Sequence, residues 1–179
     1  MRVLVDACVL YPTVMREMVL GVAEAGLFQV RWSARITEEW TRAARKLGEA
    51  GGVQAEAEAA QVAMRFPDAV VKPDLEQQAR LWLPDPDDIH VLSAAISGSC
   101  DVILTLNAKD FPRNLLAEEG LSRSDADGFL HGIWQANPAP VADVANAVLE
   151  TARHLSGQPW EMRKLLKKAR LPRLAKALG

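Results

Sequence analysis

The stretch LPDPDDIHVLSAAISGSCDVILTLNAKDF, from Leu83 to Phe111, predicts a helix followed by a buried strand. Asp85 and Pro86 are typical of an N-cap and of the first helical position, and Gly98 is typical of a helix end. We therefore expect a helix from about Pro86 to Ile96. The aliphatic and β-branched run from Cys100 to Leu106 indicates a short strand.

Acidic residues stand at both ends of this stretch. On a helical wheel Asp88 falls on the apolar stripe of its helix, whereas Asp87 points away from the stripe. Two interpretations are open for Asp88: a capping acid that works with Asp85 at the helix start, or a carboxylate that faces a site. A polar turn that contains Asn107 and Asp110 follows the strand.

Length and composition favour a soluble protein with one compact domain and an extension. The chain has 179 residues, and 49% of them are apolar, enough to bury a core. It contains no apolar run of about 18 residues and no signal-peptide pattern, so we expect no membrane association and a cytoplasmic location. Cys8 and Cys100 lie in apolar stretches, which is typical of reduced, buried cysteines.

The charges are unevenly distributed along the chain. Residues 153–179 hold 8 Lys and Arg against 1 acid, whereas residues 1–152 hold 13 against 22. The basic tail has two interpretations: a solvated helical face packed through its leucines, or an arm that contacts phosphates. The leucines are Leu165, Leu166 and Leu171, and the candidate RNA contacts are Lys164, Lys167, Lys168 and Arg170.

The N-terminal part of the chain contains two further candidate site acids, Asp6 and Glu39. VLVDACVL predicts a strand that ends at Asp6, where ligands bind in open parallel sheets, although a turn-capping acid is the alternative. Ser33 is expected to cap a helix on which Glu39 lies at the margin of the apolar stripe and Glu38 lies opposite. The alternative for both glutamates is a solvated acid near a helix N-terminus.

Phosphatase chemistry is excluded at this first strand. A DxD phosphatase would need an acid at Cys8, and a C-x5-R phosphatase loop would need an arginine closer to Cys8 than Arg16.

The rest of the chain predicts alternating helices and short strands. We expect residues 48–52, which include three glycines, to form a break between two helices. The other predicted helices span 13–25, 53–65, 124–136, 141–155 and 160–169, and the other predicted strands span 27–32 and 69–72.

A parallel sheet would bring Asp6, Glu39, Asp88 and Asp110 to one edge. Carboxylates that converge repel each other and raise one another's pKa unless a cation neutralises them, and oxygen ligands favour Mg²⁺ or Mn²⁺ over zinc. Such a site can activate water for phosphodiester hydrolysis without a nucleophilic side chain. The histidines show no metal-ligand spacing, and His90 is expected at the surface.

Four motifs together resemble the PIN-domain nucleases, including the VapC-type toxins of toxin–antitoxin pairs. The motifs are VLVDACVL, S-x-x-I-x-E-E from Ser33, DPDDIHVLSAA from Asp85, and DVILTLNAKDF from Asp101, and they cover about residues 1–120. The resemblance implies a three-layer α/β/α sandwich with a central parallel sheet. It implies a nuclease domain over residues 1–122, and residues 123–179 would then form a C-terminal helical extension.

The resemblance also assigns roles to residues of this chain. It implies a Mg²⁺- or Mn²⁺-dependent endoribonuclease site with Asp6, Glu39, Asp88 and Asp110 as catalytic metal ligands. Thr105 and Asn107 would support them, with either Asn107 or Asp110 touching the metal. RNA would be the substrate, and the partners would be a cognate antitoxin and a second copy in a homodimer. The alternatives are a PIN-like module that binds RNA or protein without cleaving, and a DNA-directed nuclease.

Overall fold

The computed structural model describes all residues, 1–179, as two compact units. Unit 1 consists of Met1–Tyr11 and Gln29–Ser124, and unit 2 of Pro12–Phe28 and Asp125–Gly179. The sequence predicted an extension from residue 123 but did not group residues 12–28 with it. The predicted division of the chain into domains at residue 122 stays a prediction.

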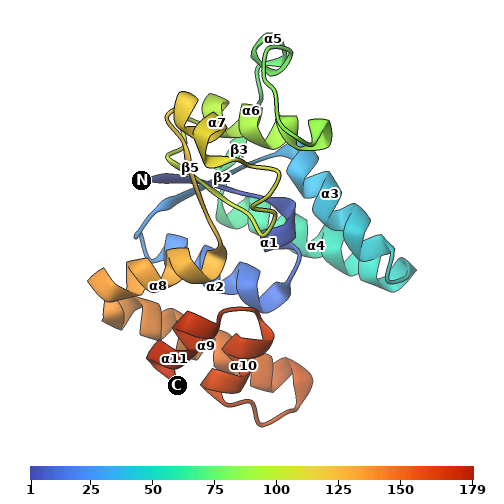
Figure 1. Cartoon of the computed structure of the whole chain (residues 1–179). Helices are drawn as coiled ribbons and strands as arrows, with labels where there is room; N and C mark the ends of the chain where they lie inside the picture. Colours follow the sequence, from blue (N-terminus) through green and yellow to red (C-terminus); the bar gives the residue numbers. More distant parts are fainter. The chain divides into compact units, whose positions relative to one another are not determined.

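Unit 1 is built on a five-stranded sheet of order β3-β2-β1-β4-β5 in which every pair of neighbours is parallel (Figure 1). The register pairs Val5 with Leu104 and Ser33 with Val71. The strands are β1 (Arg2–Val5), β2 (Gln29–Ser33), β3 (Val70–Val71), β4 (Val102–Leu104) and β5 (Ser122–Ser124). Strand β5 was not predicted, because its Ser-Arg-Ser sequence carries no apolar signal.

The central strands form the core because they are apolar on both faces. Val3, Leu4 and Val5 of β1 and Ile103 and Leu104 of β4 are completely buried. Strands buried on both faces are expected in a parallel sheet that helices cover. The sheet is flanked by helices, as the predicted α/β/α sandwich requires.

Helix α6 covers one face of the sheet, since it packs against β1, β2 and β4. A 3₁₀ turn, η1, leads into it, so the predicted helix from Pro86 has two parts. The helical segments of unit 1 are α1 (Ala7–Leu10), α3 (Ala34–Arg45), α4 (Glu49–Arg65), α5 (Leu75–Gln78), η1 (Pro86–Asp88), α6 (Ile89–Ser97) and α7 (Arg113–Glu118).

The break between the two helices covers residues 46–48 rather than the predicted 48–52, and Gly48 has a φ of 122°. Helix α4 begins at Glu49 and includes Gly51 and Gly52. A Cβ atom at Gly52 would lie 2.4 Å from Cγ of Arg45, so this glycine permits the close approach of α3 and α4. The glycine at position 52 is therefore explained by close helix packing rather than by a turn.

All the regular secondary structure of unit 2 is helical. A Cβ atom at Gly21 of α2 would lie 2.6 Å from Val144 of α9, which shows how closely these two helices pack. The leucines of the tail, Leu165, Leu166 and Leu171, are buried. The helices are α2 (Thr13–Glu24), α8 (Ala126–Ala136), α9 (Pro138–Ser156), α10 (Met162–Lys168) and α11 (Pro172–Leu178). None of the chain's helices is both long and apolar enough to cross a lipid bilayer.

Candidate metal centre

Asp6 follows β1 and is tied to the end of β4. Its side chain is 7% exposed, and its Oδ2 accepts hydrogen bonds from Thr105 Oγ1 at 2.7 Å and from Cys8 Sγ at 3.1 Å. Thr105 Oγ1 in turn accepts a hydrogen bond from the backbone N–H of Asn107 at 3.0 Å. The parallel pairing of β1 and β4 therefore brings Asp6 to Thr105 and the turn that follows it.

Three aspartates converge beside this point. Carboxylate oxygens of Asp85, Asp88 and Asp110 lie within 4.8 Å of one another. Asp85 is the N-cap of η1 and Asp88 is its last residue, whereas Asp110 belongs to the turn after β4. Three acids from two separate segments thus present oxygen atoms to a single small volume.

Asp85 is a member of this cluster that the sequence interpretation missed. We assigned it only an N-cap role, and it does cap η1, because its Oδ1 accepts the backbone N–H of Asp87 at 3.0 Å. Asp88 makes no side-chain capping hydrogen bond, so the capping interpretation of Asp88 was wrong. The i, i+3 spacing of Asp85 and Asp88 was the available signal, since residues three apart lie on the same side of a helical turn.

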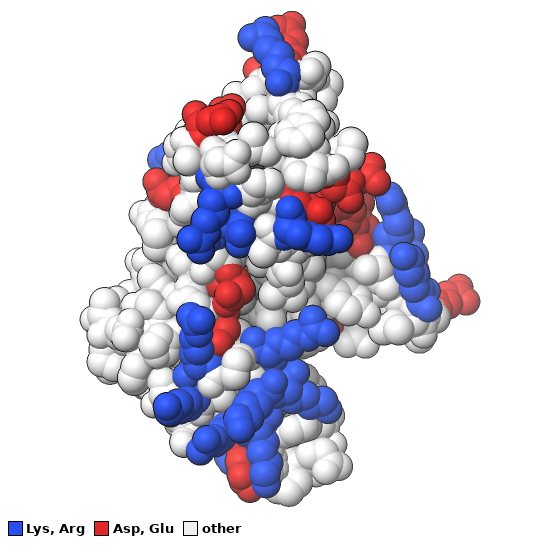
Figure 2. Space-filling view, in the orientation of Figure 1, with Lys and Arg blue, Asp and Glu red and all other residues white.

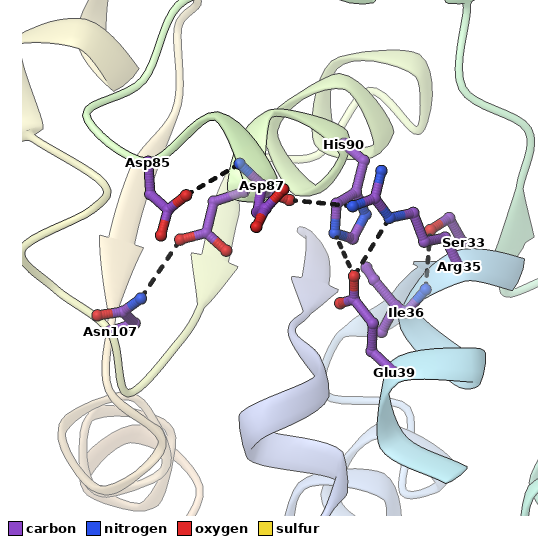
Figure 3. A network of polar contacts seen from close by, with 9 residues as sticks. Ser33, Arg35, Ile36, Glu39, Asp85, Asp87, His90 and Asn107 are labelled. Atoms are coloured by element: carbon purple, nitrogen blue, oxygen red, sulfur yellow. Dashed lines mark hydrogen bonds and ion pairs between the residues drawn. The ribbon is translucent and has the colours of Figure 1, made fainter. Parts of the chain in front are cut away.

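Electrostatics link Asp6 to the three aspartates. Burial, followed by the negative charges of Asp6, Asp85 and Asp110, raises the pKa of Asp88 from 3.8 to about 6. Asn107 Nδ2 donates a hydrogen bond to Asp88 Oδ2 at 3.3 Å (Figure 3). Like charges held this close are costly unless a cation neutralises them. An all-oxygen donor set of this kind fits a hard divalent cation such as Mg²⁺ or Mn²⁺.

Glu39 is not a member of this cluster and contacts two basic side chains. Its Oε1 lies 3.2 Å from Nε of Arg35 and 2.9 Å from Nε2 of His90 (Figure 3). Burial raises the pKa of Glu39, but its contacts with His90 and Arg35 and their charges together bring it below its usual value. Glu39 is therefore ionised at neutral pH, and it is not one of the acids that meet within 4.8 Å.

His90 was wrongly expected at the surface. It is 3% exposed, and both of its ring nitrogens are buried without a hydrogen bond of good geometry, although Nε2 lies 2.9 Å from Oε1 of Glu39. The side of the helix opposite the apolar stripe is not exposed here, because the residues of α6 from His90 to Ala95 are all buried. The periodicity of one helix cannot identify a polar partner on another element.

Metal binding should depend on pH through Asp88. Because a metal ligand must be deprotonated, Mn²⁺ affinity should fall about tenfold per pH unit below a pKa of about 6. Calorimetry near pH 6 in two buffers of different ionisation enthalpy should show proton release on Mn²⁺ binding, with little release at pH 8. Equal affinities at pH 5 and pH 7 would contradict this role of Asp88.

A comparison with protein-family models places this chain in a known family. Residues 2–109 match the model of the PIN domain, which is more than half of the chain. The chain belongs to the PIN-domain family. No curated protein and no solved structure gave a significant match.

PIN domains are generally metal-dependent nucleases. The matched region contains Asp6, Glu39, Asp85 and Asp88, and it ends one residue before Asp110. The oxygen-rich cluster agrees with the use of divalent metals by this family.

Proposed function

We propose that this PIN-domain protein is a Mg²⁺- or Mn²⁺-dependent endoribonuclease. The observation that carries the proposal is the convergence of Asp85, Asp88 and Asp110 within 4.8 Å, with Asp6 close enough to raise the pKa of Asp88. These acids would hold the metal, and the bound metal would activate water and stabilise charge on the phosphodiester.

The other side chains of the site orient these acids. Thr105 donates to Asp6 and fixes the direction of its carboxylate, and Asn107 does the same for Asp88. Ligands that are held in place by hydrogen bonds bind metal more tightly. In our proposal Glu39 is a fifth acid of the site, which contributes to metal binding from its own position beside His90.

Cys8 is not a nucleophile in this proposal. Burial and the charge of Asp6 raise the pKa of the Cys8 thiol to about 12, so the thiol stays protonated at neutral pH. Its Sγ donates to Asp6 instead. A reaction driven by activated water needs no covalent intermediate, so an inert thiol at this position is compatible with hydrolysis.

We further infer that the protein is a VapC-like toxin that acts on RNA and has a cognate antitoxin as its partner. We also infer that it is a homodimer and lies in the cytoplasm. The support for these inferences is the motif resemblance, together with the fact that PIN domains bind nucleic acids and often pair with antitoxins. Co-expression with the product of the neighbouring gene would test the antitoxin, and light scattering would test the dimer. A monomer that the neighbouring product neither binds nor inhibits would refute both inferences.

The deciding experiment is cleavage of matched RNA and single-stranded DNA by the purified protein. We expect internal RNA cuts with Mg²⁺ or Mn²⁺ and none with EDTA. Cleavage of DNA alone would favour a DNA-directed nuclease of the same fold. Tight RNA binding without cleavage under any metal condition would favour a catalytically quiet module.

The basic tail is our candidate for a second RNA contact. Figure 2 shows Lys and Arg side chains gathered over the α10 and α11 segments. Lys167 and Lys168 are exposed, and Lys168 Nζ lies 4.9 Å from the Trp160 ring centroid. The burial of the tail's leucines agrees with the packed-face interpretation, and a packed helix can still present lysines to phosphate. Lys164 pairs with Glu161, and Arg170 has a φ of 61°, so both are poorer positions for a test.

The double variant Lys167→Gln/Lys168→Gln should weaken RNA binding and reduce its salt dependence. Each lost phosphate contact should lower the slope of log K against log salt by about 0.7 for a single strand. Filter binding over a range of salt concentrations measures this slope, with Lys46→Gln on an exposed lysine as the control. An unchanged slope would show that these lysines only solvate their helix.

A further inference from the structure

An acidic metal centre needs nearby positive charge to bind a polyanion. Phosphate contacts supply most of the affinity of a protein for a nucleic acid and position it on the protein. Asp6, Asp85, Asp88 and Asp110 repel the substrate wherever a metal does not neutralise their charges. The basic residues next to the centre are therefore candidates for substrate contacts, and the following inference rests on the proposed nuclease function.

Arg35 is such a residue, and it spans from α3 to the turn that carries the aspartates. Its Nε donates to Glu39 Oε1 at 3.2 Å, and its Nη2 donates to the backbone carbonyl of Asp87 at 3.5 Å (Figure 3). Asp87 belongs to η1 and lies between Asp85 and Asp88 in the sequence. The guanidinium is thus fixed at the edge of the metal centre, although Arg35 belongs to another helix.

The guanidinium keeps unused donors that are open to solvent. An arginine has five N–H groups, and these two contacts use two of them. The side chain is 50% exposed, so the remaining three can reach a ligand. A guanidinium with a fixed plane is suited to bind two phosphate oxygens at once.

The anchor of Arg35 is itself fixed. Glu39 is held by the buried ring of His90 at 2.9 Å, and Ser33 Oγ caps the first turn of α3 by accepting the Ile36 N–H at 3.3 Å. The contacts of Glu39 with His90 and with Arg35 therefore join α6 to α3. They leave free the edge of the guanidinium that faces away from Glu39. Such preorganisation reduces the entropy that Arg35 loses when it binds an anion.

We propose that Arg35 binds a phosphate group of the nucleic-acid substrate next to the scissile bond, and that Glu39 and His90 hold it in position to do so. The contact is made by the guanidinium edge that faces away from Glu39. It is the same before and during the reaction, so it contributes to substrate affinity rather than to the chemical step. It carries no base specificity, since phosphates are common to all sequences.

The test compares Arg35→Gln and Arg35→Lys with the parent and with Arg42→Gln, a control at an exposed arginine on the same helix. With an RNA that the parent cleaves, Arg35→Gln should raise KM by at least about tenfold, as expected when a charge-assisted contact to phosphate is lost, and change kcat by less than about threefold. Arg35→Lys should be intermediate, because it keeps the charge but loses the planar fork. Arg42→Gln should match the parent.

Equilibrium binding gives a second readout that does not depend on catalysis. With EDTA present to keep the RNA intact, Arg35→Gln should lower the slope of log K against log salt by about 0.7, to a similar extent for RNAs of different sequence. Mn²⁺ affinity measured by calorimetry should stay within about twofold of the parent. Circular dichroism tests whether each variant is folded. If Arg35→Gln is unfolded, the KM and the salt slope of Arg35→Lys are compared with those of the parent instead.

The outcomes separate this inference from the proposed function. A fall in kcat and Mn²⁺ affinity with unchanged KM and salt slope would overturn it, because Arg35 would then serve only to position Glu39. A parent that cleaves RNA and an Arg35→Gln variant with identical constants would also overturn it, while the nuclease proposal would stand. A parent that neither cuts nor binds RNA would refute the nuclease proposal itself.

Discussion

Asp88→Asn should lower metal-dependent RNA cleavage by at least about 100-fold while the protein remains folded. Asp88 contributes an oxygen to the cluster with Asp85 and Asp110, and its neighbours' charges converge on it. Loss of groups that merely support a metal ligand typically costs 10- to 100-fold, so loss of a ligand itself should cost more. Initial rates on one RNA with saturating Mn²⁺ measure the effect.

The same substitution should stabilise the metal-free protein at neutral pH. The folded-state pKa of Asp88 is raised to about 6 from 3.8, so its stabilising contribution is present at low pH and is lost as pH rises through 6. Asparagine removes the carboxylate that is unfavourable above that pH. The Tm of the variant in EDTA should therefore exceed that of the parent at pH 7.5, and the difference should shrink towards pH 4. Added Mn²⁺ should raise the Tm of the parent more than that of the variant.

Asp87→Asn is the matched control for both measurements. Asp87 is the neighbouring residue and is exposed, and its backbone carbonyl rather than its carboxylate contacts Arg35. We expect cleavage within about threefold of the parent. An Asp88→Asn variant that cuts RNA as fast as the parent would show that the metal centre lies elsewhere.

Phe111→Ala should destabilise unit 1 by about 3–5 kcal/mol, the usual cost of truncating a buried phenylalanine. Phe111 is completely buried and directly follows Asp110. Its backbone carbonyl accepts a hydrogen bond from Arg123 Nε at 2.6 Å, which ties it to β5. The ring therefore anchors the turn that delivers Asp110 to the cluster, and Mn²⁺ affinity should fall together with stability.

Hydrogen exchange of the β1 and β4 amides is the appropriate measurement, because it reports on unit 1 separately from unit 2. Trp82→Ala is the control, since Trp82 is 66% exposed and its loss should change stability by no more than about 0.5 kcal/mol. If Phe111→Ala cost less than about 1 kcal/mol, the ring would not be the anchor of this turn.

The sequence by itself determined the local elements and the order of the acids. Short apolar runs predicted β1, β2 and β4, and an apolar stripe with the helical period predicted α3 and α6, because both are local signals. The cap at Ser33 followed from the hydroxyl that accepts the Ile36 N–H. Parallel strands put Asp6 and the turn with Asp110 at one edge, and the structure brings both close to Asp88.

Only the tertiary structure decided which side chains meet. Asp85 belongs to the cluster because Asp110 arrives from the turn after β4, and His90 is buried because Glu39 faces it from α3. Strand β5 exists because it pairs with β4, and α2 belongs to unit 2, where it packs against α9. Each of these depends on a partner far away in the chain, which the pattern within a single segment cannot reveal. The sequence could therefore identify these acids as candidates, whereas the contacts of Glu39 with Arg35 and His90 could be found only in the folded structure.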